Sequence, residues 1–194
     1  MKNLASLLLL ALSANAFAND GGITKDTGIN YNEIGLGYFS IRIADSADFN
    51  GYAVKGSTLI TLITDNIYID AAYASGSYSS NTMTLSEANL GYRFPIGAST
   101  DGIASIGYTG ITFTDEDSSN GYSIKFGVIS KLTDDFKISG FYKYSNISNN
   151  DPYNTGTLDA QYNLTKSFYT NISYNSMSGG STAKYYMLGV GYNF

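Results

Sequence analysis

The chain of 194 residues contains no cysteine, no histidine and no tryptophan, and only 2 prolines. Without cysteine it has no disulfide framework, no thiolate metal site and no thiol nucleophile. Without histidine it lacks the usual general base and the commonest metal ligand. We therefore expect no enzymatic activity, no catalytic residue, no metal site and no cofactor.

Positive charge is also scarce, with 11 basic and 16 acidic residues and a net charge of −5. The lysines are scattered along the chain instead of forming the clustered basic surface that nucleic-acid binding requires. We therefore expect no nucleic-acid partner. What the chain does contain in abundance is glycine and tyrosine, with 21 and 18 residues.

The N-terminus has the features of a secretory signal. A lysine follows the first methionine, and the apolar run after it is too short to cross a bilayer as a helix. Ala16 and Ala18 form a small-x-small cleavage motif, and Ala14 with Ala16 forms a second one. We predict a signal peptide over residues 1–18 and a single β-barrel domain over residues 19–194. A retained amphipathic helix is disfavoured because the segment has no polar face.

The rest of the chain alternates apolar and polar residues with a period of two, in ten short segments separated by turn-forming residues. In the last segment the apolar positions are Tyr186, Leu188, Val190, Tyr192 and Phe194. Outside the signal no apolar run is long enough for a membrane-spanning helix. The pattern predicts an all-β fold.

The opposite face of these segments carries small residues and most of the charges. We predict that these charged residues share that face: Lys55, Asp70, Glu87, Arg93, Lys125, Lys131, Lys137, Lys143 and Asp159. In a soluble sandwich or lipocalin-like barrel the charged face would meet water. In a transmembrane barrel the apolar face meets lipid, and the charged face lines the lumen.

Three observations favour the membrane. Tyrosines cluster at one end of the apolar face and phenylalanines at the other, as lipid interfaces select. The predicted connections alternate between short turns, such as Asp65-Asn66, and longer polar loops, such as 146–155. Glycine and alanine on the charged face suit a narrow barrel, and segments of about 9–11 residues suffice to cross a bilayer.

A sheet in lipid must close, because an open edge would leave backbone groups without hydrogen bonds. We therefore predict a closed antiparallel transmembrane up-and-down β-barrel of about ten strands, with eight as the alternative, and with both termini in the periplasm. Arg42 has the parity of the apolar residues Ile34 and Tyr38. It either lies above the membrane or follows a bulge that shifts the register.

The C-terminal segment, which alternates apolar residues and ends in Phe194, resembles the assembly signal of Gram-negative outer-membrane proteins. Together with the Gly-Tyr pairs at strand ends, it resembles the family of small porin-like outer-membrane barrels. The resemblance implies localisation in the outer membrane of a Gram-negative bacterium, contact with outer-membrane lipid and lipopolysaccharide, and recognition by the barrel-assembly machinery. It does not determine the oligomeric state. Enzymes among such barrels generally depend on a histidine, which this chain lacks.

The charges of the predicted lumen leave two functions open. We expect pairs between Lys143 and Asp159 and between Asp70 and Arg93, if the strands have the simplest register. Six basic residues against four acids, with Glu33 included, predict a mild preference for anions. One function is a porin-like barrel whose narrow polar lumen passes small solutes or ions slowly. The other is a non-conducting barrel that stabilises the envelope or displays acidic polar loops for adhesion.

Overall fold

The computed structural model describes residues 27–43, 47–61, 64–114, 118–148, 151–179 and 182–194, so Ala16 and Ala18 lie outside the described residues. The described residues form ten strands: β1 (Glu33–Ile43), β2 (Ala47–Leu59), β3 (Ile67–Tyr78), β4 (Asn81–Pro95), β5 (Thr100–Phe113), β6 (Ser119–Lys131), β7 (Phe136–Ile147), β8 (Tyr153–Asn163), β9 (Phe168–Gly179) and β10 (Ala183–Asn193). In the described part of the chain, no helix is long and apolar enough to span a membrane.

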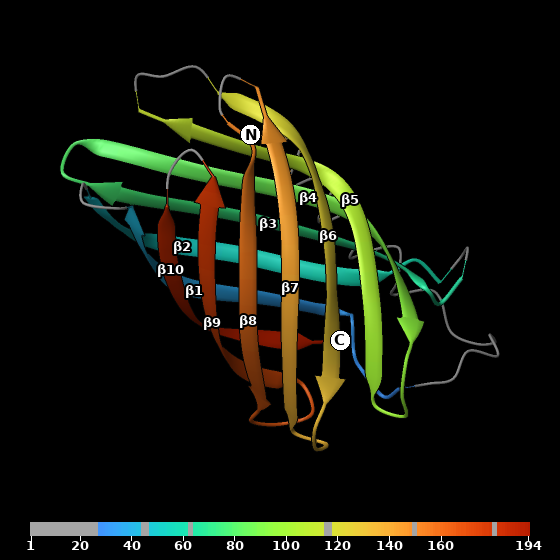
Figure 1. The fold of residues 1–194 in the computed structure, drawn as a ribbon. Coiled ribbons are helices and arrows are strands. Elements are labelled where there is room, and N and C mark those ends of the chain that lie inside the picture. The colour runs from blue at the N-terminus through green and yellow to red at the C-terminus, as the bar shows by residue number, and fades with distance from the viewer. Residues whose placement is uncertain (1–26, 44–46, 62–63, 115–117, 149–150, 180–181) are drawn as a thin grey trace.

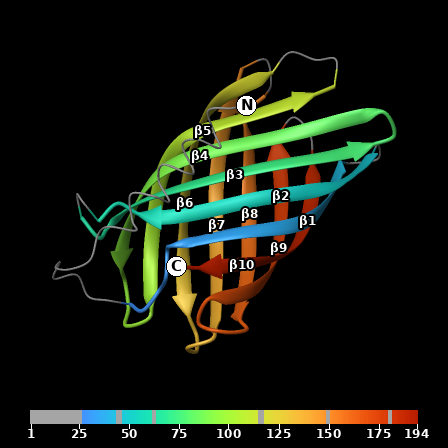
Figure 2. The ribbon, with the colours of Figure 1, turned by 180° about the vertical axis from the view of Figure 1, so that it is seen from behind.

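The strands form one closed barrel in which each strand pairs antiparallel with its sequence neighbours and β1 pairs with β10. The strands of the two walls cross at a steep angle in Figure 1 and in the reverse view of Figure 2, as strongly tilted strands do. The predicted fold class is confirmed, and ten strands replace the alternative of eight.

The barrel has its large apolar side chains on the outside and its polar side chains inside. Leu188 on β10 is 64% exposed, and Leu36 and Ile172 are also exposed, whereas Asp101 and Ser123 are fully buried. An apolar surface that continues around the whole barrel would be unstable in water, but it suits hydrocarbon. The orientation of the two faces is the one expected for a transmembrane barrel.

Aromatic rings pair across strands near both ends of the outer surface. The rings of Tyr122 and Tyr144 lie 6.5 Å apart, toward the end opposite the C-terminus. At the end that holds the C-terminus, the ring centroids of Phe168 and Tyr192 are separated by 5.3 Å. Two belts of amphipathic rings match the two interfaces of a bilayer. We call the end that holds the C-terminus and the connections 60–66, 96–99, 132–135 and 164–167 the terminal end, and the other the loop end.

The predicted alternation of loop lengths is wrong. Strands have 11 to 15 residues, longer than expected, and they extend through the polar segments that were expected to form loops. The connection 148–152 is therefore short, and the longest connection, 60–66, lies at the terminal end. The reason is that the backbone ladder between strands does not require apolar side chains, so pairing continues through serine, threonine and asparagine.

Arg42 follows no bulge. The pairing of β1 with β2 is regular throughout, and Arg42 stands opposite Asp48. Its guanidinium donates to both carboxylate oxygens of Asp48, at 2.8 Å from Nε and 3.0 Å from Nη2. The exposed pair lies at the loop end of the outer face, where the charge is clear of the hydrocarbon.

Inward-facing glycines accommodate rings from neighbouring strands. Tyr169 on β9 lies over Gly191 and Gly35, and a Cβ on Gly191 would fall 2.2 Å from Tyr169 Cζ. Tyr68 lies over Gly91 in the same way. The small residues of the charged face therefore leave space for aromatic rings that fill the narrow interior.

Candidate functional site: the barrel lumen

A belt of four ion pairs crosses the lumen and joins strands that are not neighbours in the sheet. Each pair has a lysine from one wall and a carboxylate from another. The pairs are Lys125–Asp70 at 2.8 Å, Lys137–Glu33 at 3.0 Å, Lys55–Asp159 at 3.4 Å, and Lys143–Glu87. Charges held away from bulk water need such partners, and the narrow barrel lets lysine side chains reach across it.

The pairs predicted between neighbouring strands do not form. Asp159 stands opposite Ser139 on β7, so Lys143 is not beside it and pairs with Glu87 instead. Asp70 likewise binds Lys125 instead of Arg93. Long side chains that cross the lumen outcompete neighbours in the sheet, and their partners follow from the three-dimensional closure of the barrel.

Asp101, at the start of β5, is a lumen charge that the sequence reasoning missed. It is fully buried, and its Oδ2 accepts hydrogen bonds from Tyr31 at 2.9 Å, Thr27 at 3.1 Å and Arg93 at 3.3 Å. It follows closely on Pro95 and Gly97, residues typical of turns and loops. Asp101 and Ser105 are four residues apart on β5, so their side chains point to the same face of the strand, and Ser105 faces inward. This spacing is the signal that could have identified Asp101 as a lumen residue.

The segment 27–32 enters the lumen at the terminal end. Ile29 and Tyr31 are buried against Tyr68 and Ile103, and the Arg93 guanidinium lies 5.2 Å from the centre of the Tyr31 ring. Ser57 Oγ donates to the Tyr31 carbonyl at 2.6 Å. Together these contacts fix the segment across the terminal end of the barrel.

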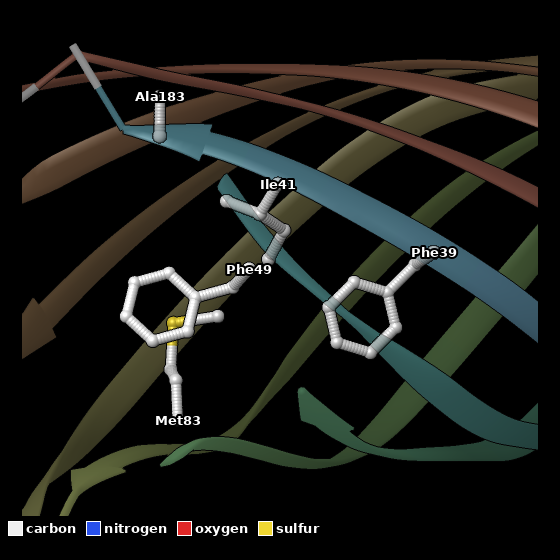
Figure 3. Packing of buried hydrophobic residues seen from close by; sticks show 5 residues of the cluster. All are labelled: Phe39, Ile41, Phe49, Met83 and Ala183. Carbon is white, nitrogen blue, oxygen red and sulfur yellow. The ribbon is translucent and has the colours of Figure 1, made fainter. Parts of the chain in front are cut away.

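The loop end of the lumen is apolar. Phe39, Ile41, Phe49, Met83 and Ala183, from β1, β2, β4 and β10, pack together inside the barrel (Figure 3). The expectation of a polar lumen therefore holds for the middle of the barrel but not for this end. The sequence of β1 shows this change from polar to apolar lining. Its inward-facing residues are glycines at 35 and 37 but Phe39 and Ile41 nearer the loop end.

Between these two ends lies a cavity of about 290 Å³. Charged residues of the belt line it together with alanines and large apolar side chains. Representative lining residues are Lys55, Ala72, Leu85, Glu87, Phe141 and Met187. The interior is thus amphiphilic, with charges and apolar surface facing one small space.

The charges of the lumen balance. Each of the six predicted basic residues has a carboxylate partner: Lys55, Arg93, Lys125, Lys131, Lys137 and Lys143. Lys131 reaches Asp134 in the exposed turn 132–135 at 2.9 Å, and its hydrogen bond and charge lower the pKa of that carboxyl. The excess of positive charge expected from sequence disappears once Asp101 and Asp134 are counted. Among the described residues, no group of His, Cys, Asp and Glu could hold a metal ion.

No protein-family model and no curated protein matches the sequence. Among solved structures, an outer membrane channel from Pseudomonas putida F1 is similar over 91% of this chain and 100% of its own, with 10% identity and a TM-score of 0.54. The KdgM porin in complex with oligogalacturonate covers 82% of this chain and 99% of its own, at 14% identity and a TM-score of 0.48. The NanC porin covers 84% and 100%, at 11% identity and a TM-score of 0.47.

These similar structures are outer-membrane channels and porins. The similarity to the outer membrane channel, at a TM-score of 0.54, shows that this chain has the same class of fold, a closed antiparallel β-barrel. Within that class its features are the ten short-looped strands, the ion pairs across the lumen and the segment that closes the terminal end.

Proposed function

We propose that the protein is exported through its signal peptide, cleaved next to Ala16 or Ala18, and inserted into the outer membrane of a Gram-negative bacterium. The barrel-assembly machinery would bind the C-terminal strand, whose outward positions end in Tyr192 and Phe194. Two observations support this role: β10 closes the barrel with β1, and its apolar face is exposed to the surroundings of the barrel. The terminal end then faces the periplasm, and lipid and lipopolysaccharide surround the barrel.

In that membrane the barrel acts as a narrow, slow channel for small solutes or ions, without enzymatic activity. The observation that carries this proposal is the charged belt around an internal cavity. A barrel that serves only as a structural element gains nothing from charges around a cavity, because desolvating them costs free energy. The apolar cluster and the segment 27–32 cap the two ends, so passage requires local movement and is slow.

Single-channel conductance of the refolded mature protein in a planar bilayer tests this proposal. Heat-modifiable migration on a gel first establishes that the barrel is folded. We expect small, brief openings whose preference shifts toward cations in Lys125→Ala, because Asp70 then loses its ammonium partner. Lys184→Ala, an equal change of charge at an exposed position, should leave the preference unchanged. A folded, inserted and silent barrel would overturn the proposal and favour the structural alternative.

A further inference from the structure

Two opposite charges flank an alanine in one row of the sheet. The register places Lys55 of β2 opposite Ala72 of β3, and Ala72 opposite Glu87 of β4. All three residues line the cavity. Neighbouring strands are about 4.8 Å apart, so the two charged residues start about 10 Å from each other across the alanine. The short alanine side chain leaves the space between the two charges open.

Both charges keep hydrogen-bonding capacity after their ion pairs are made. Lys55 is 29% exposed and Glu87 is 26% exposed, the two highest values in the four pairs of the belt. Within the described residues, Lys55 makes one long hydrogen bond, at 3.4 Å, to Asp159, whose carboxylate also accepts from Asn171 and Ser173. An ammonium has three donors, so Lys55 can still bind an anion in the cavity.

Glu87 is in the complementary situation. Lys143 binds its Oε1, and no residue in the described ranges donates a hydrogen bond to its Oε2. A carboxylate oxygen accepts about two hydrogen bonds, so Glu87 can still bind a cationic donor. Two groups of opposite charge therefore flank Ala72 in the cavity. The ammonium of Lys55 can still donate hydrogen bonds, and the carboxylate of Glu87 can still accept them.

The next row toward the loop end is apolar. Ala53 stands opposite Ala74, and Ala74 stands opposite Leu85, directly beside the charged row. Met187 of β10 also lines this part of the cavity, and it packs against the apolar cluster at the loop end. A ligand held by the two charges would place its remaining atoms against apolar side chains.

We propose that this cavity binds a zwitterionic α-amino acid with an aliphatic side chain. Its carboxylate would lie at Lys55 Nζ, its ammonium at Glu87 Oε2, and its side chain against Ala74 and Leu85. A volume of about 290 Å³ holds a molecule of roughly ten non-hydrogen atoms, since one water takes about 30 Å³. The proposal rests on the proposed function, because it makes the cavity a solute site on the path through the barrel.

Ligand-observed saturation-transfer NMR of the folded mature protein, in perdeuterated detergent micelles, tests the site with leucine as the probe. Three analogues each lack one recognised feature: 4-methylpentanoate lacks the ammonium, isopentylamine lacks the carboxylate, and glycine lacks the side chain. We expect leucine to bind about tenfold more tightly than each analogue, the usual loss for one missing charged hydrogen bond or buried apolar group. Equal binding of leucine and any one analogue overturns the assignment of that feature.

Variants locate the site. Lys55→Met should weaken leucine binding about tenfold. Lys131→Met makes the same change at a lysine of similar exposure outside the cavity, and it should have no effect. Ala72→Phe should abolish binding by filling the space, whereas Ala160→Phe, on the outer face, should not. Equal effects of the two lysine variants overturn the proposal.

Conductance of the same preparations separates this proposal from the proposed function. A barrel that conducts potassium chloride but does not bind leucine overturns the amino-acid site and leaves the channel intact. A barrel that binds leucine but never conducts supports the site and overturns the channel.

Discussion

Removing the carboxylate of Asp101 should destabilise the whole barrel. Arg93 is almost buried, with its side chain 8% exposed, and Asp101 is its carboxylate partner at 3.3 Å. Asp101→Ala leaves that buried guanidinium without a counter-charge, and it leaves the hydroxyls of Tyr31 and Thr27 without their acceptor. Breaking a buried pair from one side costs about 3–5 kcal/mol. We expect a loss of that size in the free energy of unfolding.

The double variant Arg93→Met/Asp101→Ala should recover much of the loss, because replacing both partners of a buried pair by apolar side chains is often close to neutral. Recovery will be incomplete, since Arg93 Nε also donates to the Asp65 carbonyl at 2.7 Å, and the hydroxyls of Tyr31 and Thr27 still lack their acceptor in the double variant. One such hydrogen bond is worth about 1 kcal/mol. With three such bonds lost, we expect the double variant to lie about 2–3 kcal/mol below the unmodified protein and above the single variant.

Reversible urea unfolding of the barrel in lipid vesicles, followed by circular dichroism and by gel migration, measures these free energies. Asp134→Ala, at an exposed turn, is the control and should change stability by no more than about 0.5 kcal/mol. The argument is refuted if Asp101→Ala behaves like this control, or if the double variant is no more stable than the single one. Faster amide hydrogen exchange at residues 29–31 in Asp101→Ala would show that the segment 27–32 is held through this carboxylate.

Three further predictions concern the outer face, the packing of the interior and the Lys131–Asp134 pair at the terminal end. Leu188→Lys should destabilise the barrel in lipid by up to about 2–4 kcal/mol, measured by urea unfolding, because the ammonium would enter hydrocarbon. Gly191→Ala should cost about 1–3 kcal/mol because its methyl group would overlap a buried tyrosine ring, whereas Gly156→Ala, with nothing within 4 Å, should be nearly neutral. The pKa of Asp134, measured by NMR, should lie below the usual aspartate range and rise in Lys131→Met. Since the folded state lowers this pKa, the stabilisation exists above the unfolded pKa and is lost as the pH falls through the folded value.

The Lys131–Asp134 pair contributes little to the stability of the barrel, because the Asp134 side chain is exposed to solvent, which screens the interaction. The pairs of the belt are different, since each of their side chains is less than one third exposed.

The period-two alternation was enough to predict the barrel and the directions of the side chains in its regular segments, although it missed Asp101 at the start of β5. Successive residues of a strand point to opposite faces, so the parity of Leu188 or Lys125 follows from local geometry alone. The alternation alone did not show whether the apolar face meets lipid or forms a soluble core. The clustering of aromatic residues at the two ends of that face favoured lipid. Loop lengths were predicted wrongly, because backbone pairing continues through polar side chains and the sequence pattern does not mark where it stops.

What only the tertiary structure decided is how the interior is filled. Lys143 finds Glu87 and Lys55 finds Asp159 because closure and tilt bring non-neighbouring strands within the reach of a lysine. The same closure brings the segment that contains Tyr31 onto Asp101, and it leaves a cavity where alanines face each other. Side-chain parity is a property of each strand, whereas these contacts depend on the relative height of strands on opposite walls, which no single strand encodes.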